Sequence, residues 1–580
     1  MNLTPEEKAV GKENFCAAIG SDVKDKHGES RRDFLKKGIM AGVVSGGGLG
    51  AFYFGYKGAI ADPVRVGVIG TGDEGSVLIG AINPEFIEVK SIADIRPYNQ
   101  YRAFHGDCYS PAAQKVRCGL LKKYGWATEN EARKQVKVYG PYEELIANAK
   151  ADGIEAVIIA LPLHLHCPAA IAAMEAGLHV LTEKLMAHSV AQCKQMARVA
   201  KQTHRHLATG HQRHYNILYD NAVDQIRRGL LGELHFVRAQ WHRGNLPGTD
   251  SWQQPMPEKL KPDDSQAARL QKELVSWKRK LESVTTTKEI EEWQAKVAQK
   301  KAQIADELLD GKVEGYGYEA KKYKDADGKV IYDRPAAEEL IRWRLWDRTG
   351  GGLMAELGSH QLDAASIFIS AVHDGVKQYP LNVAAAANRP LFPQDRDVND
   401  HVYCIYEFPA PGYDPASPVD SRKKIGVQYS SINGNGFGGY GEMVFGTNGT
   451  LILEREQEAM LFATGSASSK INVTQDKDGD GPTMDTQASG EEPAAVGKMA
   501  TLDVSRGYTE EEEHWAWCIR NNPQNEDPDL QPKCYPKVAM ADAVIALTTN
   551  IAARRGMRVE FKKEWFDPDD DATPEADLGT

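Results

Sequence analysis

The sequence predicts an α/β domain followed by an α+β domain, within a chain of 580 residues. Short apolar runs alternate with helical patterns through residues 62–213, which indicates a parallel sheet with helices on both faces. Residues 214–580 instead contain runs in which apolar and polar side chains alternate, typical of a mainly antiparallel sheet. With 42% hydrophobic and 26% charged residues, the composition is that of a globular chain long enough for two cores.

The first domain is predicted to open on the strand PVRVGVIG at 63–70, an apolar run that ends in glycine. Its continuous apolar character is that of a parallel strand covered on both faces. The same reasoning predicts four further strands and four helices. The strands are 87–94, 154–162, 178–184 and 206–212, and the helices are 76–84, 142–149, 168–177 and 189–203.

The second domain is predicted to combine a helix with an open sheet that two insertions interrupt. The helix is 216–229, and the strands are 233–242, 402–408, 424–432 and 441–454. In the insertion at 255–340, apolar residues recur at 4-3-4-3 spacing from Leu270 to Val284, and Thr286 with Glu289 forms a candidate capping box. We therefore expect an inserted antiparallel helical hairpin, and we interpret it as a packing or oligomerisation device.

The second insertion, at about 464–500, is rich in Ser, Gly, Asp and Thr and predicts a polar surface loop. Its DKDGDG stretch at 476–481 has the acidic spacing of a calcium loop. The twelfth position is Gln487 rather than glutamate, and no helices flank the stretch, so a solvated acidic turn is the expectation.

The N-terminal region is predicted to be an export signal, residues 1–61. Ser30-Arg31-Arg32-Asp33-Phe34-Leu35-Lys36 resembles the consensus of twin-arginine (Tat) signals, and a weakly apolar segment follows at 38–56. Small residues near its end predict cleavage after Ala61, with retention as an N-terminal anchor as the alternative. The expected location is the periplasm or cell envelope, and the Tat machinery is an expected partner.

A glycine motif follows the first strand and opens a helix, Gly70-x-Gly72-x-x-Gly75. This spacing lets the backbone turn tightly, approach a pyrophosphate and pack helix against strand, so it predicts a Rossmann dinucleotide-binding domain. Asp94 ends the second strand, where a carboxylate accepts both ribose hydroxyls. It would repel a 2′-phosphate, so we expect NAD as cofactor, while the nearby Arg96 keeps NADP as the alternative.

Polar side chains follow the later strands of this domain, at the edge where an open α/β sheet binds its ligand. His164 and His166 come after the strand at 154–162, and Glu183 and Lys184 end the strand at 178–184. The two histidines are placed to line the dinucleotide cleft. No cysteine or carboxylate converges on them in sequence, so no metal site is predicted.

A third polar group lies in WDRTGGGLMAELGSHQLDAA, residues 346–365. Glu356, His360 and Asp363 stand at i, i+4 and i+7, which places them on one face of a helix. Three glycines precede that helix. A glycine-rich bend that feeds a polar stripe lowers core stability, which indicates a functional site.

These residues complete a pattern that resembles the Gfo/Idh/MocA oxidoreductases, from about Val64 to Phe561 apart from the two insertions. The motifs that carry the resemblance are GVIGTGDEG, ADIRP, ALPLHLHCPAAIAAMEAGLHVLTEK, GHQRH, GGLMAELGSHQLD and VFGTNGTL. The resemblance implies an N-terminal Rossmann domain and a C-terminal α+β open-sheet domain whose face covers the nicotinamide. It also implies that a lysine contacts the substrate hydroxyl and the nicotinamide, and that a histidine is the usual acid/base.

The family motifs E-K-P and D-x-G-x-H correspond here to Glu183-Lys184-Leu185 and Glu356-x-Gly358-x-His360. Leucine in place of proline alters the backbone that directs the lysine, and glutamate in place of aspartate lengthens the carboxylate by a methylene. The resemblance assigns catalytic roles to Lys184, His360 and Glu356. It assigns cofactor contacts to Gly70, Gly72, Gly75, Asp94, Arg96, Leu161, His166, Glu183, Lys184 and Gln212, and substrate contacts to Arg213 and Asp363.

The expected function is that of an exported NAD-dependent oxidoreductase acting on a sugar, polyol or glycoside, with a tightly bound cofactor recycled in place. One alternative is a glycoside hydrolase or lyase that works by transient oxidation and β-elimination. Another is an NAD-bound, non-catalytic envelope or assembly protein. A homo-oligomer is expected, and the formal net charge of -11 argues against a nucleic-acid partner.

Overall fold

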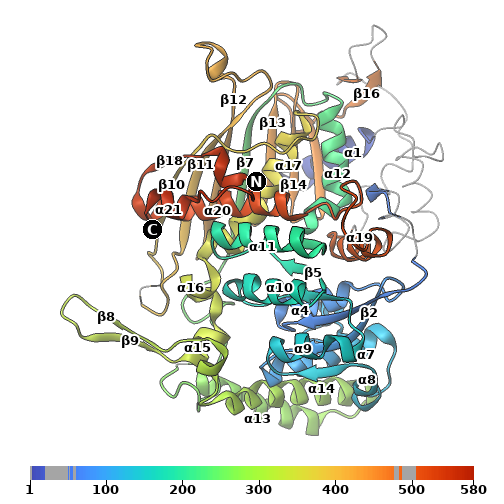
Figure 1. Ribbon diagram of the computed structural model, residues 1–580, viewed down its shortest axis with the longest axis vertical. Helices are drawn as coiled ribbons and strands as arrows, with labels where there is room; N and C mark the ends of the chain where they lie inside the picture. Colours follow the sequence, from blue (N-terminus) through green and yellow to red (C-terminus); the bar gives the residue numbers. More distant parts are fainter. Residues whose placement is uncertain are drawn as a thin grey trace.

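The computed structural model describes residues 3–19, 50, 53–56, 60–264, 266–392, 394–475, 482–485 and 505–579 (Figure 1). The twin-arginine stretch at 30–36 and the acidic turn at 476–481 lie outside the described residues. Among the residues that are described, no helix is both long and apolar enough to cross a bilayer.

The first domain is built on a six-stranded parallel sheet in the order β3-β2-β1-β4-β5-β6. Its strands are β1 Val64–Ile69, β2 Ile87–Ala93, β3 Lys137–Tyr139, β4 Ala156–Ile159, β5 His179–Glu183 and β6 Leu207–Gly210. Successive side chains of β4 enter opposite cores, Val157 and Ile159 one and Ala156 and Ile158 the other. The predicted parallel sheet covered on both faces is therefore confirmed.

Helices cover the two faces of this sheet. One core includes α9 Tyr142–Asp152, α10 His166–Glu175 and α11 Val190–Thr203, and the other includes α4 Asp73–Ala81 and α5 Pro97–His105. Three short helices follow α5, namely α6 Pro111–Val116, α7 Gly119–Tyr124 and α8 Glu129–Gln135. The strand order reverses at β1 and β4, so the carboxyl ends of these two strands form the crevice where such sheets bind ligands.

The second domain is built on an eight-stranded mixed sheet in the order β15-β14-β13-β7-β12-β11-β10-β18. Only the β7–β12 pair is parallel, and every other pair is antiparallel, close to the mainly antiparallel sheet that was predicted. The strands are β7 Leu234–His242, β10 Asn382–Asn388, β11 His401–Pro409, β12 Lys424–Ile432, β13 Tyr440–Gly446, β14 Gly449–Glu454, β15 Glu458–Ala463 and β18 Arg558–Glu560. A separate hairpin joins β16 Asn472–Gln475 to β17 Pro482–Asp485.

Helices α12 Ile217–Arg227, α17 Ser359–Ala371 and α20 Pro536–Arg555 belong to this domain, and α17 and α20 lie against its sheet (Figure 1). Two shorter helices are α16 Asp347–Gly350 and α21 Pro574–Leu578.

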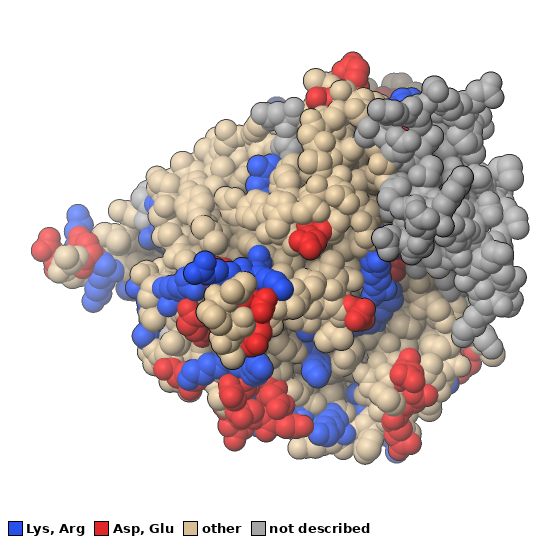
Figure 2. Space-filling view, turned by 90° about the horizontal axis from the view of Figure 1, so that it is seen from above, with Lys and Arg blue, Asp and Glu red and all other residues tan. Residues whose placement is uncertain are grey.

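Figure 2 shows basic and acidic side chains interspersed on the upper face of the molecule, as expected from a chain in which both signs of charge are abundant.

The insertion at 255–340 contains the predicted helical hairpin, α13 Ala267–Ser283 and α14 Thr287–Ile304. The hydroxyl of Thr286 accepts the backbone N–H of Glu289 at 3.3 Å, which confirms the N-terminal cap of the second helix. The hairpin is followed by the β8 Lys321–Lys324 and β9 Val330–Arg334 pair and by α15 Ala336–Ile341. Helix α14 lies against α5 of the first domain, so the hairpin packs within its own chain.

Helix α1, Pro5–Ala17, precedes the twin-arginine stretch and packs on β15 of the second domain (Figure 1). Asn14 Nδ2 donates to the Leu461 carbonyl of β15 at 3.1 Å, and the Asn14 side chain also bonds the backbone of Ser469 and Ile471 beyond that strand. Phe15 is buried in the large core that also contains Leu461. Part of the segment that we expected to be removed as a signal therefore contributes to the folded body.

Helix α19, Tyr508–Asn521, lies late in the sequence but packs against the first domain. Its Trp515 and Ile519 belong to the same core as Val64 and Val66 of β1. The sequence assigned residues 508–521 to the second domain. The structure shows that this helix completes the core of the first one, because its apolar side chains cover one face of the parallel sheet.

Helix α19 also buries four consecutive glutamates, Glu510–Glu513. Burial raises the pKa of Glu512 well above its ordinary value, and neither of its carboxylate oxygens has a hydrogen-bond partner in the part of the chain that is described. The folded carboxyl thus keeps its proton to higher pH than the unfolded one. Unfolding then releases a proton, and stability falls as the pH rises from the ordinary glutamate pKa through the raised one.

We therefore expect Glu512→Gln to stabilise the protein at about pH 9 and to leave stability nearly unchanged at about pH 5. The gain across this window should be up to about 1.4 kcal/mol per pH unit. Thermal unfolding at the two pH values measures it. The exposed Glu526→Gln serves as control and should match wild type at both values. An equal gain at both pH values would contradict the raised pKa.

Candidate active site

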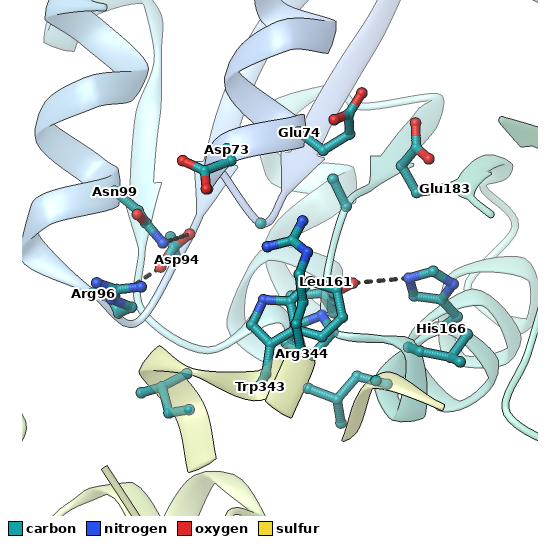
Figure 3. Close-up of a pocket in the computed structure, with 18 of the residues that line it drawn as sticks. Asp73, Glu74, Asp94, Arg96, Asn99, Leu161, His166, Glu183, Trp343 and Arg344 are labelled. Atoms are coloured by element: carbon teal, nitrogen blue, oxygen red, sulfur yellow. Dashed lines mark hydrogen bonds between the residues drawn. The ribbon is translucent and has the colours of Figure 1, made fainter. Parts of the chain in front are cut away.

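A cavity of about 1110 Å³ lies at the carboxyl ends of β1, β2, β4 and β5, and β7 of the second domain also contributes to its wall. Figure 3 shows Trp343 and Arg344 reaching into the space between Asp94 on one side and His166 on the other. The cavity is thus bounded by the glycine loop, by the ends of the parallel strands and by side chains from beyond residue 213.

The glycine loop has the close approaches that a dinucleotide site needs. Gly70 has φ +83°, and a Cβ at this position would overlap the Ala160 carbonyl oxygen. At Gly75 a Cβ would overlap the Gly70 carbonyl oxygen, so this glycine lets α4 start against β1. Gly72 lines the cavity, and a Cβ there would meet only Asn99 Nδ2, at 3.6 Å. The backbone at Gly72 is therefore open for a pyrophosphate at the N-terminus of α4.

Asp94 lies at the end of β2 with its carboxylate held by backbone and side-chain donors. Its Oδ2 accepts the N–H of Thr71 at 2.8 Å and Asn99 Nδ2 at 3.1 Å, and its Oδ1 accepts the N–H of Arg96 at 2.9 Å (Figure 3). The carboxylate lines the cavity at the position expected for a ribose. The loop and this acid together fit NAD.

His166 and Leu161, both predicted to contact the cofactor, line the same cavity. The His166 ring lies 2.8 Å from both the Leu161 and the Leu185 carbonyl oxygens, and burial lowers its pKa. A neutral ring donates to one of these carbonyls at a time. His164, which we expected beside it, is not among the lining residues and instead contacts the Tyr318 ring edge-on at 5.4 Å.

Glu183 and Lys184 project from the end of β5 into the cavity. Burial, reinforced by the charge of Glu74, raises the pKa of Glu183 to about 8. Lys184 Nζ donates to the Glu356 carbonyl oxygen at 2.6 Å, which ties the lysine to the second domain. The peptide bond from Lys184 to Leu185 is cis.

Glu356 was predicted to be catalytic, and the structure places it in an ion pair. Arg344 Nε donates to its Oε1 at 2.7 Å, while Lys184 Nζ lies 4.0 Å from its Oε2. Burial alone would raise the pKa of Glu356, but Arg344 and Lys184 outweigh it and lower the pKa. A carboxylate held as an anion in this way orients the two cations and is poorly suited to accept a proton. The sequence did not single out Arg344.

His360 lines the cavity beside Lys184. Burial, with the charges of Lys184 and Arg213, lowers its pKa well below the usual range, so the ring is neutral near pH 7. Its Nδ1 is buried without a hydrogen-bond partner among the described residues. The ring of Trp241 lies 5.7 Å away and walls the site. A neutral imidazole in such a position can accept a proton from a ligand hydroxyl.

Arg213 and Asp363, predicted to bind substrate, do not line the cavity. Arg213 is buried behind it, donates to the backbone carbonyl of His360, and pairs with Glu442 at 3.0 Å and Glu456 at 2.9 Å. The helix turn at Met354–Gly358 is a π turn, so Glu356 and His360 face the cavity while Asp363 falls behind it. Arg213 therefore supports the backbone of His360, while Asp363 pairs with His214 at 2.9 Å.

Behind His360, the side chains of His211, Asp363 and Asp542 are close enough to hold a metal ion. Both carboxylates already pair with a lysine, because Lys377 Nζ lies 2.8 Å from Asp542 and 3.5 Å from Asp363. We assign the group a structural role.

Gln212, predicted to contact cofactor, does line the cavity, and its Nε2 donates to Glu456 at 3.4 Å.

Several lining residues escaped the sequence analysis. They are aromatic or basic and include Trp241, Arg243, Trp252, Trp343, Arg344 and Tyr508. Of these, only Trp241 could have been predicted from the sequence, because it lies near the end of a predicted strand at 233–242. The others lie in irregular segments, in the short 3-10 helix Trp343–Leu345 or in α19, where no local pattern points to a site.

Residues 64–211 match the family model described as "Oxidoreductase family, NAD-binding Rossmann fold". A "Glycosyl hydrolase family 109 protein" from Solibacter usitatus is 26% identical over 211 residues, 35% of this chain and 44% of that protein. An "Uncharacterized oxidoreductase ORF334" from Rhizobium meliloti is 30% identical over 187 residues, 32% of this chain and 47% of that protein. The chain thus spans less than half the length of these curated relatives.

The fold also matches a solved structure, an inositol dehydrogenase homolog complexed with NAD+ from Azotobacter vinelandii. The two are 14% identical with a TM-score of 0.51, and the match covers 87% of this chain and 98% of the other. This likeness extends the comparison of fold to both domains. The match over residues 64–211 makes the first domain similar to the NAD-binding Rossmann domain of the Gfo/Idh/MocA oxidoreductases.

Proposed function

We propose that the chain is an NAD-dependent oxidoreductase that acts on a sugar, polyol or glycoside. The observation that carries the proposal is the meeting of Lys184, from the first domain, and His360, from the second, in the cavity that contains the glycine loop. The match of residues 64–211 to an NAD-binding oxidoreductase family supports the redox chemistry. The name of the structural neighbour from Azotobacter vinelandii, an inositol dehydrogenase homolog, favours a polyhydroxylated substrate.

When NAD is bound, it supplies the hydride acceptor. The residues of this chain then handle the proton of the substrate hydroxyl. Lys184, anchored on the Glu356 carbonyl, donates a hydrogen bond to the hydroxyl oxygen and stabilises its developing negative charge. His360 accepts the proton through Nε2, the ring nitrogen opposite the buried Nδ1. The Glu356–Arg344 pair keeps the lysine in position.

A turnover screen tests the proposal. Nucleotide released from the purified full chain is identified by mass, and the protein is then assayed for NADH formation on a panel of sugars, polyols and glycosides. NAD in the protein and NADH formation on one class of substrate are the expected results. NAD bound with neither NADH formation nor glycoside cleavage on the panel would favour the non-catalytic envelope or assembly role instead.

Glycoside cleavage is the second candidate, because several curated relatives are named as glycosyl hydrolase family 109 proteins. In that case oxidation would be transient, followed by β-elimination, water addition and return of the hydride. A chromogenic glycoside separates the two candidates. Release of its aglycone without accumulation of NADH indicates cleavage, whereas NADH accumulation with the glycoside intact indicates net oxidation.

Export by the Tat route is part of the proposal, supported by the stretch Ser30–Lys36. Outside the cytoplasm no exchangeable NAD pool exists, so the cofactor would be loaded before export and recycled in the site. The packing of α1 on β15 favours a retained N-terminus over cleavage after Ala61. The mass of the chain recovered from the cell envelope decides this, and an Arg31→Lys/Arg32→Lys variant should remain in the cytoplasm.

Self-association is also proposed. The second sheet leaves Tyr403 and Ile405 of β11 exposed on the same face, with Ile405 60% exposed. Apolar side chains gathered on a sheet face are common at subunit interfaces. Light scattering on the purified chain gives the oligomeric state, and Ile405→Lys should shift it toward the monomer. An unchanged assembly would place the interface elsewhere.

A further inference from the structure

The helical insertion covers the ribose end of the cavity. Its segment after α14 supplies Gly315, Tyr316, Gly317 and Tyr318 to the cavity wall, on the side where Asp94 ends β2. Figure 1 shows α13 and α14 running along the base of the first domain. The insertion therefore builds part of the cofactor site.

Polar contacts fix the insertion to the segment that follows α5. Gln299 of α14 accepts the backbone N–H of Cys108 at 2.6 Å through Oε1 and donates to Asp107 Oδ1 at 2.8 Å through Nε2. The Tyr109 and Trp277 rings lie 6.0 Å apart. These contacts hold the hairpin against the first domain at one side of the ribose position.

An apolar cluster holds the other side. Met256, Leu309 and Val313 of the insertion are buried together, and Ile95 and Leu165 of the first domain pack against them. Ile95 directly follows Asp94 in the chain. The wall is therefore continuous with the strand end that carries the ribose-binding acid.

At the centre of this contact, Asp306 of the insertion forms an ion pair with Arg96. Asp306 Oδ2 accepts Arg96 Nε at 3.0 Å and Nη2 at 2.9 Å, and its Oδ1 accepts the N–H of Tyr98 at 3.0 Å. Asp306 is 1% exposed and Arg96 is 7% exposed. Such a fork-to-carboxylate pair uses the face of the guanidinium that would otherwise bind a phosphate.

This pairing bears on the choice between NAD and NADP. The 2′-phosphate of NADP needs a cation at the adenosine ribose, and Arg96 lies two residues after Asp94 in the sequence. We propose that Asp306 makes the site selective for NAD, because it holds Arg96 in an internal pair and leaves Asp94 to repel a 2′-phosphate. Asp306 is then a specificity-determining residue supplied by the insertion, and its role rests on the cofactor assignment in the proposed function.

The test compares binding of NADH and NADPH to the full chain after bound nucleotide has been stripped, by titration of their fluorescence. Wild type should prefer NADH. Asp306→Asn removes the charge that holds Arg96, and the NADPH-to-NADH affinity ratio should rise at least ~10-fold. Asp310→Asn is the matched control, since Asp310 lies in the same insertion but pairs with Lys259 on the surface at 3.3 Å. It should leave the ratio unchanged.

A buried arginine without its partner can unfold a protein, so a second variant keeps the test decisive. In Arg96→Leu/Asp306→Leu both charges are removed together. This double variant should bind NADH and gain no affinity for NADPH, because no cation has been freed. A folded Asp306→Asn with an unchanged ratio overturns the proposal, as does an equal gain in the double variant. Wild type that binds neither nucleotide would instead refute the proposed function.

Discussion

His360→Ala is expected to lower kcat by roughly 10²–10⁴-fold on a substrate found by the screen, with a much smaller change in KM. His360 lines the cavity with Lys184, and its pKa is lowered by burial and by the neighbouring positive charges. The neutral ring is therefore present at working pH to take the hydroxyl proton. Removing it leaves Lys184 beside only the ion-paired Glu356 carboxylate, which is poorly suited to accept a proton.

Chemical rescue distinguishes a proton acceptor from a structural residue. The cavity left by His360→Ala should admit imidazole, and added imidazole should restore part of kcat. His373→Ala is the control, because His373 lies just past the end of α17, contacts the Pro409 carbonyl at 3.1 Å and is not among the residues that line the cavity. Its turnover should stay close to wild type. Wild-type turnover in His360→Ala would remove the assignment.

Local patterns in the sequence were sufficient for most of the first domain. The strands β1, β2, β4, β5 and β6 are apolar runs that the periodicity identifies directly. Strand β3 was missed because it has three residues, Lys137–Tyr139, and lies at the edge of the sheet. Helix α19 was placed in the wrong domain, since nothing in its local pattern reveals which core its apolar face enters.

The site was predictable where a motif fixes the backbone, and less so where side chains from distant segments meet. Gly70 and Asp94 lie as expected because their conformation follows from a strand, a turn and a helix. The pairing of Arg96 with Asp306 joins positions 210 residues apart. Glu356 was assigned a catalytic role from its motif, but the pairing with Arg344 depends on how the segment at 343–345 folds over the cavity.

Gly72→Ala should separate cofactor binding from folding. A Cβ at Gly72 meets no protein atom closer than Asn99 Nδ2 at 3.6 Å, and its φ of -67° lies outside the left-handed region that favours glycine, so the fold should be preserved. The added methyl group projects into the cavity where the pyrophosphate approaches the loop. We expect affinity for NADH to fall by about 10–100-fold, a loss of roughly 1.4–2.7 kcal/mol, measured by titration of the stripped protein.

Gly75→Ala supplies the contrast, because its Cβ would overlap the Gly70 carbonyl oxygen within the protein itself. This variant should lose thermal stability even without nucleotide, as α4 is forced away from β1. Without nucleotide, Gly72→Ala should unfold at the wild-type temperature. With NAD present, it should lack the extra stabilisation that bound NAD gives to wild type. If Gly72→Ala were instead as unstable as Gly75→Ala, the loop would be serving the fold alone. The distinction matters because only a loop shaped for a ligand keeps an open, strain-free glycine at the point where a pyrophosphate must approach.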